Sequence, residues 1–137
     1  MKIQQISVFV ENQPGRLVAM LKALDQGKVN IKALSISDTA DFGIVRLVVS
    51  DATAGSASLR QAGFTTRLDW ILAAEVEDYP GALLRNVAEP LAREGVNLKY
   101  FYAFFEPSLN GRALVVLKPD NMEKAEKVLE SQAGKKA

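Results

Sequence analysis

Alternating apolar and polar residues, interrupted by helical stripes, divide the first half of the chain into six short elements. In the stretch 3–10, Ile6, Val8 and Val10 share one face, which is the two-residue period of a half-buried strand. Leu17, Leu21 and Leu24 instead recur at helical spacing. The pattern predicts strands at 3–10, 29–37, 42–49 and 64–67, and helices at 17–25 and 52–61.

The second half repeats this order of elements but ends early. The pattern predicts strands at 68–76, 98–105 and 112–118, and helices at 83–91 and after residue 121. No fourth strand is evident after the last helix. We expect that the sheet of the second half ends early or that the C-terminus is shortened.

Capping residues and one proline refine these boundaries. Asp51 is expected to cap the second helix and Gly63 to end it. Asp120 with Glu123 forms the expected capping pair of the last helix. Pro90 lies inside a helical stripe, where it removes a hydrogen bond, so we expect a kink or bulge there that absorbs one extra residue of the second half.

A short motif shows that the two halves are copies. Each copy follows a predicted strand and opens a predicted helix, and the two copies are Glu11-Asn12-Gln13-Pro14-Gly15-Arg16-Leu17 and, 66 residues later, Glu77-Asp78-Tyr79-Pro80-Gly81-Ala82-Leu83. The spacing exceeds that of solenoid repeats and fits two small domains, at residues 1–67 and 68–137. The expected fold is α+β: two ferredoxin-like β-α-β-β-α-β units in tandem, each an antiparallel sheet with helices on one face, with the last strand of the second unit missing.

Composition excludes several functional classes. The net charge of +1 gives no basic footprint for nucleic acid. The chain has no cysteine and no histidine, and therefore lacks a thiolate nucleophile and the commonest general base and metal ligand. No apolar run is long enough to span a membrane, and no signal-peptide core is present, so we expect a cytoplasmic protein without membrane association. We expect no catalytic residues, no cofactor and no metal.

The turn before each helix is the remaining candidate for binding chemistry. A helix N-terminus presents free N–H groups and partial positive charge, which suit a carboxylate. Pro14 is expected at the first helical position, leaving the amides of Gly15, Arg16 and Leu17 as donors. The alternative is that proline and glycine only shape the turn.

These residues resemble the ACT domain, a ferredoxin-like regulatory module. The resemblance rests on two features of each half, a turn with the pattern Asn/Asp-x-Pro-Gly-x-Leu and a later apolar-Asn-apolar segment. These segments are Val29-Asn30-Ile31 and Val96-Asn97-Leu98. The resemblance covers nearly the whole chain and implies a stand-alone tandem ACT protein that binds a free amino acid and regulates metabolic enzymes.

The resemblance also implies where the ligand binds, between the turn of one unit and the second strand of its neighbour. The residues implied are Asn12, Gly15, Arg16 and Leu17 with Leu98 and Tyr100, and by symmetry Asp78, Gly81, Ala82 and Leu83 with Ile31 and Ala33. Asp78 replaces Asn12 in the second turn. A carboxylate there would repel that of an amino acid, so we expect that the sites differ and that one can be vacant.

Three functional classes follow. The first is an amino-acid-binding regulatory or sensor protein. The second is a regulatory subunit of a separate enzyme, because small subunits of acetohydroxyacid synthase begin with a similar turn, although their second half does not normally repeat it. The third, an enzyme, is disfavoured by the absence of catalytic residues. Strands that are apolar on both faces, at 44–49 and 100–105, predict a homodimer.

Overall fold

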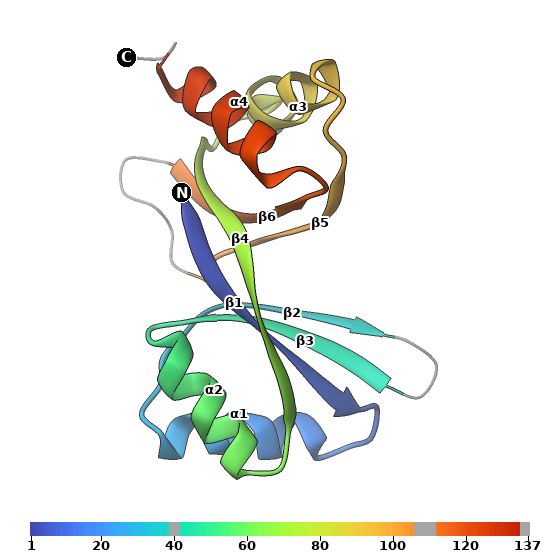
Figure 1. Ribbon diagram of the computed structural model, residues 1–137, viewed down its shortest axis with the longest axis vertical. Coiled ribbons are helices and arrows are strands. Elements are labelled where there is room, and N and C mark those ends of the chain that lie inside the picture. Colours follow the sequence, from blue (N-terminus) through green and yellow to red (C-terminus); the bar gives the residue numbers. More distant parts are fainter. Residues whose placement is uncertain (39–41, 106–111, 135–137) are drawn as a thin grey trace. The chain divides into compact units, whose positions relative to one another are not determined.

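The computed structural model describes residues 1–38, 42–105 and 112–134 (Figure 1). Six strands and four helical segments follow one another in the predicted order, and the strands are hydrogen-bonded in the order β2-β3-β1-β4-β6-β5. The elements are β1 (Lys2–Glu11), α1 (Arg16–Gln26), β2 (Ile31–Asp38), β3 (Phe42–Val49), α2 (Ala52–Gln61), β4 (Thr65–Glu77), η1 (Leu84–Ala88) continued by α3 (Glu89–Arg93), β5 (Leu98–Ala103), β6 (Arg112–Pro119) and α4 (Met122–Gly134). The structure therefore confirms the α+β class.

The chain divides into two compact units. The N-terminal unit is Gln4–Trp70, and the C-terminal unit combines Met1–Ile3 with Ile71–Ala137. Strands β1 and β4 each contribute residues to both units. The predicted strands 64–67 and 68–76 are thus one strand, because neither glycine nor proline interrupts the sequence between them. Arg67 and Asp69 form a salt bridge of 3.1 Å across two residues, as extended backbone allows.

In the N-terminal unit, α1 and α2 cover one face of the sheet (Figure 1). The apolar face predicted for β1 is confirmed, since Ile6, Val8 and Val10 are all buried in one cluster. The intervening Gln5 and Ser7 are buried as well, so this part of the strand is not half-buried as predicted. Met20 and Leu24 from α1 and Leu59 from α2 complete that cluster. Burying such side chains stabilises a fold by about 1.5–3 kcal/mol each.

The C-terminal unit has the same topology, with one strand taken from the start of the chain. Leu72 and Val76 of β4 pack with Leu117 of β6 and Ala125 of α4. The place of the missing fourth strand is taken by the first residues of β1. Ala73 donates from its N–H to the carbonyl of Met1 at 2.8 Å, and the Met1 ammonium donates to the carbonyl of Ala73 at 3.2 Å.

Local signals in the sequence located most helix ends. The Asp51 carboxylate accepts from the Ala54 N–H at 3.0 Å, and Gly63 follows α2 with a φ of 91°, as predicted. The cap predicted for α4 is wrong by one residue. The side chain of Asn121 accepts from the Lys124 N–H at 3.1 Å, whereas Asp120 accepts from the Asn97 N–H and ties the start of β5 to the end of β6.

The bulge predicted near Pro90 is present. Residues Leu84–Ala88 form a π-helical turn that runs directly into α3, with Pro90 in the first turn of α3. A π turn holds one more residue than an α turn and therefore accommodates the extra residue of this half.

Candidate functional site: the two proline-glycine turns

The first proline-glycine turn is a type II β-turn. The Arg16 N–H donates to the Gln13 carbonyl at 3.3 Å, and Gly15 has φ 88° and ψ −15°. Type II turns favour proline at the second position and need a residue with positive φ, normally glycine, at the third. Pro14 and Gly15 fill these positions. Pro14 is therefore a turn residue and not, as predicted, the first residue of the helix, which begins at Arg16.

The turn leaves part of the helix N-terminus unpaired. No side chain caps α1, and within the described residues the N–H groups of Leu17 and Val18 donate to no other group. The Arg16 N–H, by contrast, closes the turn and is not the free donor that we expected. Gly15 is open to its surroundings, because a Cβ placed on it would meet no heavy atom within 4 Å. This opening lets a small group approach the backbone.

Arg16 adds a positive charge at this turn. Its guanidinium carbon lies 4.9 Å from the centroid of the Phe64 ring, a cation–π distance. Phe64 is itself buried in the core. Among the described residues, the Arg16 side chain has no salt-bridge or hydrogen-bond partner, and its Nε is buried without an acceptor. The ring thus holds a cation that no carboxylate of the described chain neutralises.

The second proline-glycine turn has the same backbone. The Ala82 N–H donates to the Tyr79 carbonyl at 3.0 Å, and Gly81 has a φ of 84°. Its surroundings differ. The Arg85 side chain lies over the turn, and a Cβ on Gly81 would meet its Nη2 at 2.6 Å. No sequence signal indicated this contact beyond the position of an arginine four residues after the glycine.

Arg85 is held in place by two contacts. Its Nη2 donates to the Pro80 carbonyl at 3.0 Å, and its guanidinium carbon lies 5.8 Å from the centroid of the Tyr79 ring. Ala19 occupies the equivalent position at the first turn. The Ala19 N–H donates to the Gly15 carbonyl at 3.0 Å, and the Arg85 N–H donates to the Gly81 carbonyl at the same distance. The two turns therefore share a backbone conformation but differ in the side chain at this position, which is alanine in the first and arginine in the second.

The structure places the other predicted site residues on four segments, namely the two turns and the strands β2 and β5. Ala82 is buried and offers only its backbone, whereas Leu17 and Leu83 are exposed. Asn12 and Asp78 lie exposed in their turns. The strand residues are the half-buried Ile31 and the buried Ala33, on either side of a register shift in β2, and the half-buried Leu98 and Tyr100, on either side of a register shift in β5. Their pairing with the turns stays a prediction.

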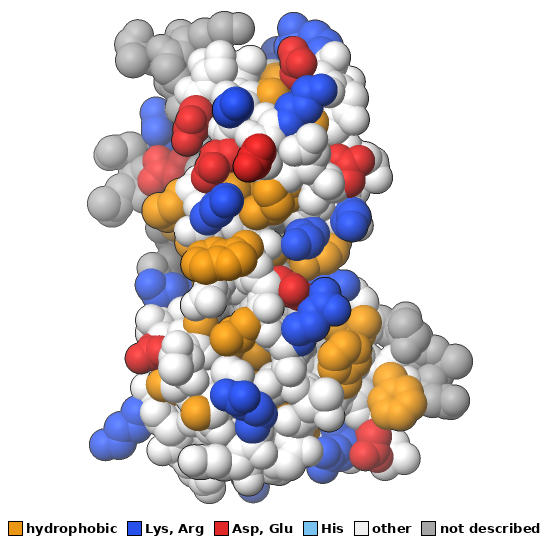
Figure 2. Space-filling view, in the orientation of Figure 1, with side chains coloured by type: hydrophobic (Ala, Val, Ile, Leu, Met, Phe, Trp, Pro, Cys, Tyr) orange, Lys and Arg blue, Asp and Glu red, His pale blue; other side chains and the backbone are white. Residues whose placement is uncertain are grey.

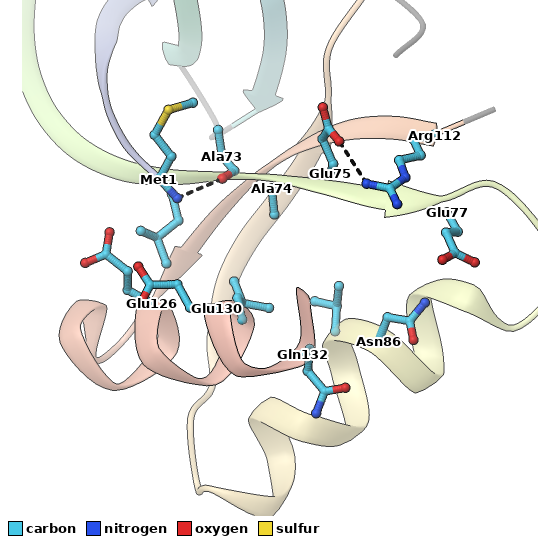
Figure 3. A pocket seen from close by; sticks show the side chains of 13 residues that line it. Met1, Ala73, Ala74, Glu75, Glu77, Asn86, Arg112, Glu126, Glu130 and Gln132 are labelled. Carbon is cyan, nitrogen blue, oxygen red and sulfur yellow. Dashed lines mark hydrogen bonds and ion pairs between the residues drawn. The ribbon is translucent and has the colours of Figure 1, made fainter. Parts of the chain in front are cut away.

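The sequence did not predict a separate pocket in the C-terminal unit (Figure 3). It has a volume of about 260 Å³ and lies between β4, η1 and α4. Glu126 and Glu130 line it from α4. Glu75 forms a salt bridge of 3.2 Å with Arg112, and both side chains are about half exposed.

The described part of the chain holds neither a metal-binding cluster nor a membrane-spanning helix. Across residues 1–38, 42–105 and 112–134, no three metal-ligating side chains are grouped as a metal site would need. Nor does any helix in this part of the chain have the length and apolarity to cross a bilayer.

Two solved structures are similar to this chain along nearly its whole length. Protein BT0572 from Bacteroides thetaiotaomicron is 34% identical in sequence, with a TM-score of 0.88 over 97% of this chain and 90% of that one. The regulatory subunit of aspartate kinase from Thermus thermophilus, in its ligand-free form, has a TM-score of 0.69 at 14% identity, over 98% of this chain and 94% of that one. The latter likeness concerns the fold alone.

Two further results complete the comparison. No curated protein matched the sequence. The family model described as the ACT domain pair matches residues 1–134. The chain therefore belongs to the ACT domain pair family.

Proposed function

We propose that this protein is an amino-acid-binding regulatory protein and that the first proline-glycine turn receives the carboxylate of a free amino acid. One observation carries the proposal: the open turn at Gly15 is followed directly by Arg16, whose guanidinium has no acceptor among the described residues. The protein acts through binding and not through catalysis.

The chemistry of the turn suits an α-carboxylate. The free N–H groups of Leu17 and Val18 point along the helix axis, where the helix dipole places partial positive charge. Arg16 adds a full charge, and its planar guanidinium can bind a carboxylate with two hydrogen bonds. The ring of Phe64 keeps that group in one place, which lowers the entropy lost on binding.

The rest of the binding site stays as the family resemblance implies. Leu98 and Tyr100 are proposed to contact the ligand at the first turn. By symmetry, the resemblance implies Ile31 and Ala33, with Asp78, Gly81, Ala82 and Leu83, for a second site, which we propose below is closed in the wild type. The ligand is proposed to be a small amino acid, because a glycine in the turn permits close approach to the backbone.

A second candidate function is that of a regulatory subunit bound to a separate amino-acid biosynthetic enzyme. It is favoured by the structural similarity to a protein named as the regulatory subunit of aspartate kinase, which matches along almost its whole length. Such a role places the protein in the cytoplasm with its enzyme. Affinity purification separates the two functions, because a co-purifying enzyme indicates a subunit and a released amino acid indicates a sensor.

We also propose a homodimer. Large apolar side chains remain exposed on the N-terminal unit, among them Phe9, Ile36 and Phe42. Figure 2 shows such side chains between charged ones on one face of the molecule. Exposed large apolar side chains that lie together commonly form part of a protein–protein interface. Light scattering should give twice the chain mass of 14.9 kDa; a value near the chain mass at micromolar concentration would contradict the dimer.

The experiment that tests the main proposal is mass spectrometry of small molecules released from the purified protein, followed by calorimetry. We expect one amino acid to be released and to bind again. If none of the twenty standard amino acids is released or bound, the sensor function is wrong and the enzyme-partner function replaces it.

A further inference from the structure

We propose that the two proline-glycine turns are functionally unequal, and that Arg85 closes the second turn to ligands while the first stays open. This inference rests on the proposed function, because it concerns which turn admits the amino acid. It makes Arg85 a residue that determines how many ligands each chain binds.

The backbones of the two turns are alike, so the difference lies in side chains. Both turns close through the same i to i+3 hydrogen bond, and the φ values of Gly15 and Gly81 are 88° and 84°. Apart from atoms of its two chain neighbours, no heavy atom of the described residues lies within 4 Å of a Cβ placed on Gly15, whereas the guanidinium of Arg85 occupies the space over Gly81. A ligand approaching Gly81 would therefore meet Arg85 first.

The contacts of Arg85 explain why it closes this turn and does not extend into water. Its hydrogen bond to Pro80 uses a carbonyl of the turn itself, and the Tyr79 ring attracts its charge. Each contact is weak at an exposed position, so the Arg85 side chain can be removed by substitution without loss of the turn.

The charges near the two turns reinforce the difference. Asp78 of the second turn would repel an incoming carboxylate, and Asn12 at the same position of the first turn would not. Arg16 begins the first helix with a cation that has no acceptor among the described residues, while the same position of the second turn holds the buried Ala82. Together with Arg85, which stands where the first turn has Ala19, three positions thus favour the first turn.

The first test uses acetate as a plain carboxylate probe and follows backbone amides by nuclear magnetic resonance. In the wild type, the amide signals of Leu17 and Val18 should shift with acetate and those of Leu83 and Leu84 should not. In Arg85→Ala, both pairs should shift. Equal shifts at both turns of the wild type would overturn the proposal, as would an unchanged second turn in Arg85→Ala.

The repeat supplies a reciprocal variant. Ala19 occupies the position of Arg85, so Ala19→Arg should cover the first turn and remove the acetate shifts there. Loss of these shifts in a variant whose other amide signals stay dispersed supports closure by the side chain. If Ala19→Arg misfolds, Arg85→Ala still tests whether the arginine closes the second turn, because Arg85 is exposed and its replacement should not disturb folding.

Calorimetry with the twenty standard amino acids, each added singly, separates this inference from the proposed function. The expected stoichiometry is one per chain in the wild type and two in Arg85→Ala, with the second lost again in Arg85→Ala combined with Gly81→Asp. Two equivalents in the wild type, one in Arg85→Ala, or loss of all binding in Arg85→Ala would refute closure. If the wild type binds none, the proposed function fails, and the acetate shifts still test the closure.

Discussion

Replacing Gly15 by aspartate tests the proposed site most directly, because it adds bulk and negative charge where a carboxylate is expected to bind. Gly15 adopts a φ of 88°, so a side chain there costs about 1–2 kcal/mol of backbone strain. Nothing lies within 4 Å of the added Cβ, so no steric clash adds to this cost. For a chain of 137 residues, each kcal/mol lowers the Tm by about 3–4 °C.

The matched control is Gly95→Asp. Gly95 has a φ of 71° and is equally open, so the variant introduces the same charge and a similar strain away from either turn. Both variants should therefore melt a few degrees below the wild type without ligand. They should differ only when an amino acid is present.

The size of the ligand effect follows from mass action. At a ligand concentration about 100 times the Kd, the folded state gains about 2.7 kcal/mol. This gain raises the Tm of a chain of 137 residues by about 9 °C. Differential scanning fluorimetry with the active amino acid should show this shift for the wild type and for Gly95→Asp, and none for Gly15→Asp. An equal shift in all three proteins would show that the ligand binds elsewhere and would refute the role of the first turn.

Three further predictions concern the fold and are measured by urea unfolding. Leu47→Ala removes a fully buried side chain and should lower the free energy of unfolding by about 2–5 kcal/mol, whereas Leu84→Ala, at an exposed residue, should change it by about 0.5 kcal/mol or less. Asp51→Ala removes the cap of α2 and should lower the free energy of unfolding by about 1 kcal/mol. Asp25→Ala, at an exposed residue, is the neutral comparison. Gly55→Leu should lower the free energy of unfolding by about 1–3 kcal/mol, because even a Cβ would lie 3.1 and 3.2 Å from side chains of β1 and β3. A stabilising Gly55→Leu, or equal effects within either matched pair, would contradict the packing described here.

Much of the fold could be predicted because its signals are local. The apolar face of β1, the Asp51 cap and the bulge before Pro90 each depend on residues close together in sequence, and the structure confirms all three. The family resemblance likewise came from motifs repeated within each half.

Two of the errors arose because residues distant in sequence determine the structure, and the third depends on a local hydrogen bond. Fourth-strand pairing in the C-terminal unit comes from Met1, which no pattern near the end of the chain could indicate. Asp120 caps no helix because its carboxylate binds Asn97, which is 23 residues earlier. Pro14 was assigned to a helix because proline suits both a first helical position and a turn, and only the hydrogen bond from Arg16 separates them.

One open turn per chain has a consequence for regulation. A chain with two equal turns could bind two amino acids cooperatively by itself, whereas a chain with one open turn binds a single ligand without cooperativity. Cooperative control must then arise between copies, since allosteric coupling needs two distinct sites that bias the same states. The proposed closure of the second turn by Arg85 and the proposed homodimer are therefore connected: the first limits each chain to one ligand, and the second supplies a pair of equivalent sites, one on each copy.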